Sequence, residues 1–98
     1  MVKEIVWSEL SIIDRFEIYT FWEEHNKSDT YSKKLEILFN QTAQLLSNFP
    51  EIGLITAFKS TKIKIISHFK IFYLIKKDSI IILRIRDARQ NPKKFKLK

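Results

Sequence analysis

The C-terminal third of the sequence constrains the fold more than any other part, because three short runs of strand-forming residues follow one another there. Residues 63–67, 69–75 and 80–87 are rich in β-branched and aromatic side chains, which fit the pleated surface of a sheet. A short polar stretch at residues 76–79 separates the last two runs, so we expect them to pair as an antiparallel hairpin. The sequence therefore predicts an antiparallel sheet here, followed by a basic tail at residues 92–98.

The predicted sheet has two different faces, because side chains along a strand point alternately to opposite sides. One face is continuously apolar and is expected to pack on the rest of the domain: Ile63, Ile65, Phe69, Ile71, Tyr73, Ile75, Ile81, Leu83 and Ile85. The other face mixes cations with large apolar residues: Lys62, Lys64, Lys70, Arg84, Arg86, Phe72, Leu74, Ile80 and Ile82. A solvated face does not need those apolar residues, and a buried face would not tolerate the cations. We expect a partner that is both apolar and negative on this face, or a cover provided by Phe95 and Leu97 of the tail.

A short strand and a helix are predicted at the start of the chain. Residues 2–7 alternate weakly between apolar and polar, and they end at Ser8. Ser8 or Ser11 can cap the helix that follows, and residues 25–28 form the turn after it. The apolar residues recur at helical spacing and are expected to face the core: Ile12, Ile13, Phe16, Tyr19 and Trp22.

A second helix shows the clearest periodicity in the sequence. Asp29 is a suitable N-cap, and Pro50 ends the pattern. Its core stripe is Leu35, Leu38, Phe39, Thr42, Leu45, Leu46 and Phe49. Residues 51–61, which contain Gly53, read as a loop with a short extended piece at residues 54–58. The expected fold class is α+β in one domain over residues 1–98: an N-terminal strand, an antiparallel two-helix hairpin, and a three- to four-stranded antiparallel sheet.

The charge balance points to an anionic partner. The chain has 98 residues, with 18 Lys and Arg against 11 Asp and Glu, a formal charge of +7. On a domain of this size such an excess indicates nucleic acid or an acidic protein, although it also serves solubility. No apolar run reaches the ~18 residues of a membrane span. The first residues do not resemble a signal peptide, so we expect a cytosolic protein.

The sequence lacks the residues on which most catalytic and metal sites depend. Without cysteine there are no disulfides, thiolate metal sites or cysteine nucleophiles. The sequence has no glycine-rich phosphate loop, HExxH motif or Cys/His ligand set, so neither metal nor cofactor is expected. His25 and His68 are interpreted as surface residues. Any chemistry would therefore depend on Lys and Arg stabilising the charge of a phosphate.

Arg89 is a candidate phosphate ligand. Asn91-Pro92 stops the last strand shortly after it, which would hold Arg89 at the strand end. A guanidinium in such a position suits bidentate contact with phosphate. The alternative is an ion pair with Asp87 or with carboxylates at a helix end.

Taken together, the sequence resembles the RelE/ParE superfamily of bacterial toxins from type II toxin–antitoxin systems. The resemblance rests on four motifs in order: EIYTFW in the first helix, NFPEIG after the second, KIFYLI in the middle strand and IIILRIRDARQNP at the end. It implies a small cytosolic toxin that is neutralised by an acidic antitoxin encoded beside it. Antitoxins of this family commonly wrap the toxin with a helix or an extended segment.

The resemblance implies two mechanisms, of which the first is ribosome-dependent mRNA cleavage by a catalytic set of cations. Lys62 and Lys64 match the spaced lysine pair of RelE-like members, and Arg89 matches a later functional arginine. Lys70 stands where those enzymes have an arginine, and it lacks the bidentate fork. Phe95 lies near the position of a Tyr or His that could move a proton, which Phe cannot do. The expected face for nucleic acid or antitoxin consists of Arg84, Arg86, Phe72, Leu74 and Phe95.

ParE-like members instead inhibit DNA gyrase by binding, without bond chemistry of their own. The helical hairpin and the final motif resemble ParE as well as RelE. The clustered cations and the positive charge favour mRNA cleavage as an endoribonuclease. Gyrase inhibition stays open, as does a decayed toxin that binds only its antitoxin.

Overall fold

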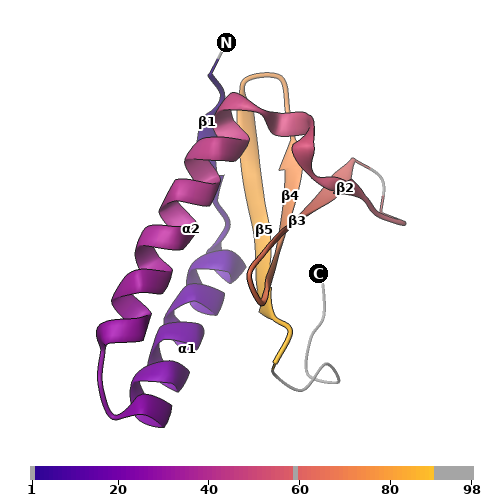
Figure 1. Cartoon of the computed structure of the whole chain (residues 1–98). Coiled ribbons are helices and arrows are strands. Elements are labelled where there is room, and N and C mark those ends of the chain that lie inside the picture. The colour runs from indigo at the N-terminus through magenta and orange to yellow at the C-terminus, as the bar shows by residue number, and fades with distance from the viewer. Residues whose placement is uncertain (1, 59, 90–98) are drawn as a thin grey trace.

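Two helices lie against one face of a five-stranded sheet in a computed structural model, which describes residues 2–58 and 60–89 (Figure 1). The predicted order of strand, helical hairpin and antiparallel sheet is confirmed. The elements along the chain are β1 (Glu4–Trp7), α1 (Glu9–Asn26), α2 (Thr30–Asn48), the 3-10 turn η1 (Pro50–Ile52), β2 (Leu54–Ile55), β3 (Thr61–Ile66), β4 (Phe69–Ile75) and β5 (Ser79–Asp87).

The strand order in the sheet is β1-β5-β4-β3-β2. Strands β2 to β5 pair antiparallel, whereas β1 pairs parallel with β5 at one edge. The backbone N–H of Lys76 donates to the carbonyl of Ser79 at 2.8 Å and closes the predicted hairpin between β4 and β5. The tail at residues 92–98 lies outside the described residues.

Helix α2 supplies most of the helical side of the core. Leu35, Phe39 and Leu46 are buried as predicted, and the ring of Phe39 meets the edge of Phe69 with centroids 5.0 Å apart. Burying a side chain of this size stabilises the fold by about 1.5–3 kcal/mol. Leu45 and Phe49, which were expected in the same stripe, are exposed, whereas Ala43, Leu46 and Ser47 are buried, so the packed side of the helix is turned away from the predicted stripe at this end. Asp29 occupies the N-cap position, but its carboxylate pairs with Lys33 at 3.2 Å instead of capping the helix.

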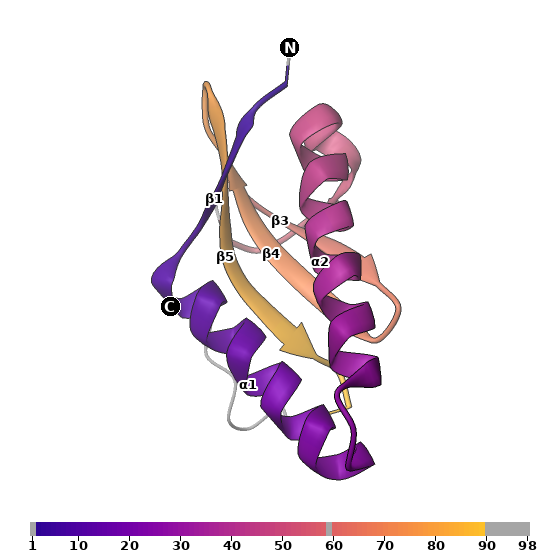
Figure 2. The same cartoon turned by 90° about the vertical axis from the view of Figure 1, so that its left-hand side faces the viewer.

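The predicted core stripe of α1 is confirmed for Tyr19 and Trp22, which pack against the core, and wrong for its other three residues. Ile12, Ile13 and Phe16 are exposed, Phe16 by 66%, and Tyr19 and Trp22 are only partly buried. The buried residues of this helix are instead Ser11, Asp14 and Ile18. Where β1 ends, α1 continues beside the edge of β5, so the side chains that face the strand must bond its backbone (Figure 2). That demand selects polar residues for the packed side of α1.

The predicted faces of β3 are also reversed. Directly paired residues of neighbouring strands share a face of the sheet. Lys62 pairs with Tyr73 and Lys64 with Ile71, and these two partners are buried beneath the helices. Both lysines therefore lie on the helix-facing side, which we call the inner face, and their neighbours Ile63 and Ile65 lie on the opposite outer face. The pattern misled because β3 lies beyond the cover of the helices, so burial does not select apolar residues for its inner side (Figure 1).

A β-bulge changes the faces of β5. Phe72 pairs with Arg84 but the next residue, Tyr73, pairs with Ile82, which leaves Leu83 as an extra residue. The extra residue shifts the alternation by one position. Ile80 and Ile82 are therefore fully buried on the inner face, contrary to their predicted position among the cations. Ile81 and Leu83, predicted for the core, are only partly buried, whereas Ile85 is buried as predicted.

Tyr73 anchors the connection between α2 and the sheet. Its hydroxyl donates to the carbonyl of Pro50 at 2.6 Å and accepts the N–H of Gly53 at 2.9 Å. A Cβ atom on Gly53 would lie 2.4 Å from that hydroxyl oxygen, so this position requires glycine. Burial raises the pKa of Tyr73 and keeps the hydroxyl protonated for this bond. The anchor fixes η1 and β2 at the free edge of β3.

Candidate functional site

The outer face carries the mixture of cations and apolar residues that the sequence predicts for a binding surface. On β4 and β5 it consists of Lys70, Phe72, Leu74, Ile81, Arg84 and Arg86. Lys70 lies directly opposite Arg86, and like charges in that position destabilise a sheet. Two cations in one cross-strand pair make this part of the outer face positively charged.

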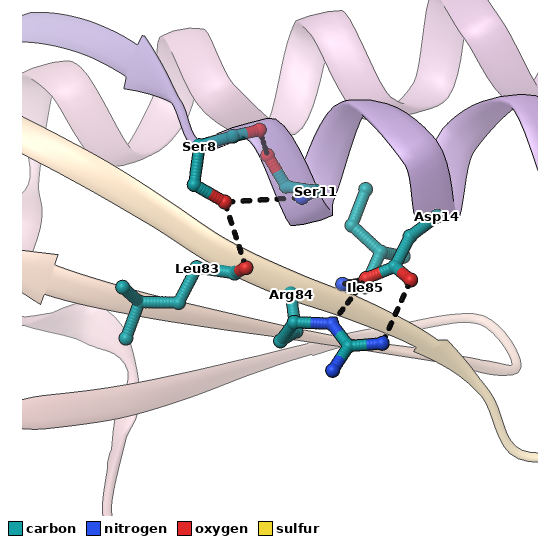
Figure 3. Close-up of polar contacts among 6 residues, drawn as sticks. All are labelled: Ser8, Ser11, Asp14, Leu83, Arg84 and Ile85. Atoms are coloured by element: carbon teal, nitrogen blue, oxygen red, sulfur yellow. Dashed lines mark hydrogen bonds and ion pairs between the residues drawn. The ribbon is translucent and has the colours of Figure 1, made fainter. Parts of the chain in front are cut away.

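Arg84 is held by an acidic partner from α1. The Arg84 Nε lies 2.8 Å from Asp14 Oδ2, and its Nη2 lies 3.0 Å from Asp14 Oδ1 (Figure 3). Asp14 Oδ2 also accepts the backbone N–H of Ile85 at 2.9 Å. The hydrogen bonds from Arg84 to Asp14 raise the pKa of Arg84 despite its burial. The charge of Arg84 is therefore locally balanced, and its first role is to join α1 to the sheet.

The N-cap residue of α1, Ser8, also forms a hydrogen bond with the backbone of β5 at this edge. The Ser8 hydroxyl donates to the carbonyl of Leu83 at 2.8 Å and accepts the N–H of Ser11 at 3.0 Å (Figure 3). Ser8, Ser11 and Asp14 thus form a row of small polar residues at i, i+3 spacing. The spacing of these polar residues is visible in the sequence. It was not recognised as the packed side of the helix, because the apolar residues on the other side were assigned to the core.

Arg89 forms an ion pair with Asp87, which was the predicted alternative to phosphate binding. Its Nε lies 2.9 Å from Asp87 Oδ1, and its Nη2 donates to Asp87 Oδ2 at 3.2 Å and to the Tyr31 hydroxyl at 3.0 Å. The guanidinium also stacks over the Trp22 ring at 4.2 Å. Trp22 Nε1 donates to Asp87 Oδ2 at 3.0 Å, a hydrogen bond that no pattern in the sequence predicts. Arg89 would have to leave these partners to bind a phosphate in bidentate fashion.

Asp87 is a buried carboxylate at the centre of this cluster. Burial alone would raise its pKa, but the hydrogen bonds from Arg89 and Trp22 outweigh burial and lower the pKa of Asp87. The carboxylate is therefore ionised at neutral pH and serves as a structural anchor. It joins the end of β5 to both helices, through Trp22 on α1 and through the bond between Arg89 and Tyr31 on α2.

Lys62 and Lys64 lie away from the other predicted catalytic cations. Both are on the inner face of β3, and Lys62 Nζ lies 3.6 Å from Glu51 Oε1. Beside Lys62 is a hollow of about 380 Å³. Its lining consists of Glu51, Ile55, Thr56, Phe58, Ser60, Thr61, Lys62 and Ile75.

The four predicted catalytic cations thus occupy three different places. Lys62 and Lys64 are on the inner face, Lys70 is on the outer face, and Arg89 is in the cluster at the end of β5. Phe95 lies outside the described residues. Within residues 2–58 and 60–89, no group of three His, Asp or Glu side chains could hold a metal ion. Among the described helices, none is long and apolar enough to cross a membrane.

The fold, unlike the sequence, has a clear counterpart among known proteins. No protein-family model and no curated protein sequence matches the chain. A solved structure described as "Chromosomal ParDE TA system from P. aeruginosa" contains a chain that superposes with a TM-score of 0.78. The two chains share one fold. The match covers 90% of this chain and 98% of the other, at 15% sequence identity.

Proposed function

We propose that this protein is the toxin of a type II toxin–antitoxin system, acting in the cytosol and neutralised by an acidic antitoxin encoded beside it. The observation that carries the proposal is the fold shared with a chain of a ParDE system over nearly the full length of both chains. The formal charge of +7 and the mixed outer face support an acidic, amphipathic partner.

We infer that the toxin acts by binding, as a gyrase inhibitor of the ParE type. A metal-free nuclease must gather its cations within hydrogen-bond reach of one scissile phosphate. Here the sheet itself separates Lys62 and Lys64 from Lys70, and Arg89 is engaged by Asp87 and Tyr31. This separation favours inhibition through a surface over cleavage through a catalytic centre.

Ribosome-dependent mRNA cleavage is the second candidate. It is favoured by one observation: Lys62 and Lys64 lie two residues apart on one side of β3, and Lys62 lines a hollow of about 380 Å³. A phosphate backbone that followed this side of β3 could meet both ammonium groups.

Induction of the protein in a bacterial host separates these functions. Gyrase inhibition predicts arrested growth, an SOS response and relaxed plasmid DNA, with mRNA left intact. Cleavage predicts halted translation and mRNA cut at codon boundaries, and Lys64→Ala would then restore growth. Lys33→Ala is the matched control, because Lys33 is exposed on α2 and pairs only locally with Asp29. Normal growth on induction would indicate a decayed toxin and would contradict both mechanisms.

The antitoxin is tested separately. A short acidic protein encoded in the adjacent reading frame should form a stable complex with this chain and restore growth when both are induced. Loss of that complex on changing Lys70 and Arg86 together to Glu would support the outer face as its contact. An unchanged affinity would contradict this assignment of the surface.

A further inference from the structure

The solvent side of α1 carries a continuous apolar stripe. The helix packs against α2 and β5, and its remaining side faces away from both (Figure 2). On this side Ile13 and Phe21 are each 44% exposed, and Phe16 is more exposed still. Ile13, Phe16 and Thr20 recur at i, i+3 and i+7, which places them on one side of a helix. A contiguous apolar stripe of this kind is typical of a surface that meets another protein.

A shallow hollow of about 380 Å³, distinct from the one beside Lys62, lies along this stripe. Its lining consists of Phe16, Glu17, Thr20, Phe21 and Glu24. All but Phe16 stand at i, i+3, i+4 and i+7, the spacing of the four side chains between which a helix receives a side chain of a facing helix. Thr20 leaves space because its side chain is short, and the Phe21 ring stacks on His25 with centroids 5.9 Å apart. The hollow therefore suits a side chain that projects from a second helix.

The charge on this side of α1 is negative. The helix contains no lysine, and its arginine, Arg15, is turned toward other elements, where it lies over the Trp7 ring and donates to Asn40. The exposed acidic residues of the helix are Glu9, Glu17, Glu23 and Glu24. The whole chain has a formal charge of +7, so the local charge of α1 is opposite to that of the chain. This side of α1 is therefore both apolar and acidic.

We infer that this side of α1 binds a basic amphipathic helix of a partner protein, with an arginine or lysine of that helix seated in the hollow. Glu17 and Glu24 border the hollow one heptad apart, about 10 Å along the helix axis, so a cation between them can pair with either. The aliphatic stem of such a side chain packs on the Phe21 ring while its charged head reaches a carboxylate. The inference goes beyond the proposed function, which assigns an acidic antitoxin to the outer face.

Charge complementarity selects the basic helix over two other occupants. A second copy of the chain that paired through its own α1 would bring the glutamates of two identical helices together, and like charges across an interface oppose binding. An acidic partner meets the same repulsion. A basic helix instead pairs with these carboxylates and covers Ile13 and Phe16 with its apolar side.

A synthetic peptide tests the inference with the complete protein. The probe is an amphipathic helix of about 20 residues, with leucines in its apolar stripe, arginines on both sides of it and a nitroxide at its centre. We expect it to quench the methyl signals of Ile12 and Ile13 in methyl-labelled protein, whereas Ile55 and Ile65 keep theirs. Loss at Ile55 would place the peptide at the hollow beside Lys62, loss at Ile65 would place it on the outer face, and either would overturn the inference.

A second peptide, with glutamate in place of each arginine, tests the charge. We expect it to bind at least about tenfold more weakly, because it meets like charges on α1. Equal affinities of the two peptides would overturn the inference, as would no binding of the arginine peptide.

Variants of the protein test the site. Glu24→Lys should weaken the arginine peptide by about fivefold, whereas Glu36→Lys, the same charge change at an exposed position of α2, should alter its affinity by less than about twofold. Equal effects of the two changes would contradict the site. A dimer of the protein alone that Phe16→Ser dissociates would show that a second copy covers this side of α1, which also contradicts it. The growth assays use no peptide, so either proposal can fail alone.

Discussion

Asp14 and Arg84 are 70 residues apart in the sequence and form a bidentate ion pair between α1 and β5. The same carboxylate accepts the backbone N–H of Ile85. One side chain therefore balances the charge of an arginine and accepts a hydrogen bond from the backbone at the edge of β5. These contacts hold the side of α1 that carries Asp14 against the edge of β5.

Asp14→Ala should therefore destabilise the protein strongly. It leaves the mostly buried Arg84 without its counter-charge and the Ile85 N–H without an acceptor. Removal of one partner of such a pair costs about 3 kcal/mol of unfolding free energy. Urea denaturation measures the loss, with Glu24→Gln on the exposed side of α1 as the control. A loss no larger than that of the control would contradict the role of Asp14.

The exposed apolar residues of α1 should be dispensable for folding. Phe16→Ser is expected to change the unfolding free energy by less than about 0.5 kcal/mol, as is usual for surface sites. Ile18→Ala, four residues from the buried Asp14, should cost about 2–4 kcal/mol through the cavity it leaves. Thermal or urea unfolding of the two variants distinguishes the observed packing from the predicted stripe. The reverse order of effects would support the stripe that the structure rejects.

Gly53→Ala should be costly because the added methyl group meets the Tyr73 ring and hydroxyl. The Cβ atom would lie 2.4 Å from the hydroxyl oxygen and 2.8 Å from Cε1 of Tyr73, whose hydroxyl is held by the backbone of Pro50 and Gly53. Overpacking of this kind costs about 1–3 kcal/mol. In a Tyr73→Phe background the cost should fall, since the hydroxyl is removed, and a double-mutant cycle measures the difference. Equal costs in both backgrounds would show that the contact is unimportant.

The Asp87 cluster predicts a loss of stability in acid. Because the pKa of Asp87 is lower in the folded protein, the carboxylate stabilises the fold above its unfolded pKa of about 3.9. This contribution disappears as the pH falls from that value through the folded pKa. Unfolding free energies measured across this range should fall less steeply in Asp87→Asn than in the unchanged protein. Identical slopes would mean that Asp87 has no shifted pKa.

Patterns within one element predicted most of the fold. Alternation and turn residues gave the strands β4 and β5, and helical periodicity gave α2, because each of these signals is local to the segment that forms it. What the sequence did not show was which neighbour each side would meet. Residues such as Ser11 and Asp14 look solvated until α1 is known to lie against a strand edge whose backbone needs partners.

The predicted positions of the site residues on the two faces of the sheet were wrong for a related reason. A single extra residue, Leu83, shifts the alternation of β5 by one position. The residues around Leu83 do not predict a β-bulge. Lys62 and Lys64 alternate with isoleucines in a strand that the helices do not cover, so the pattern could not tell inner from outer face. The sequence places these cations on strands, but their distribution over the two faces depends on long-range packing.

The most direct test of binding without catalysis is a supercoiling assay with purified components. The protein is titrated into DNA gyrase, ATP and relaxed plasmid, and in parallel into translating ribosomes with a labelled mRNA. We expect supercoiling to be inhibited, the inhibition to be reversed by the antitoxin that we propose for this chain, and the mRNA to stay intact. Full gyrase activity together with mRNA cut at codon boundaries would contradict the proposed mechanism.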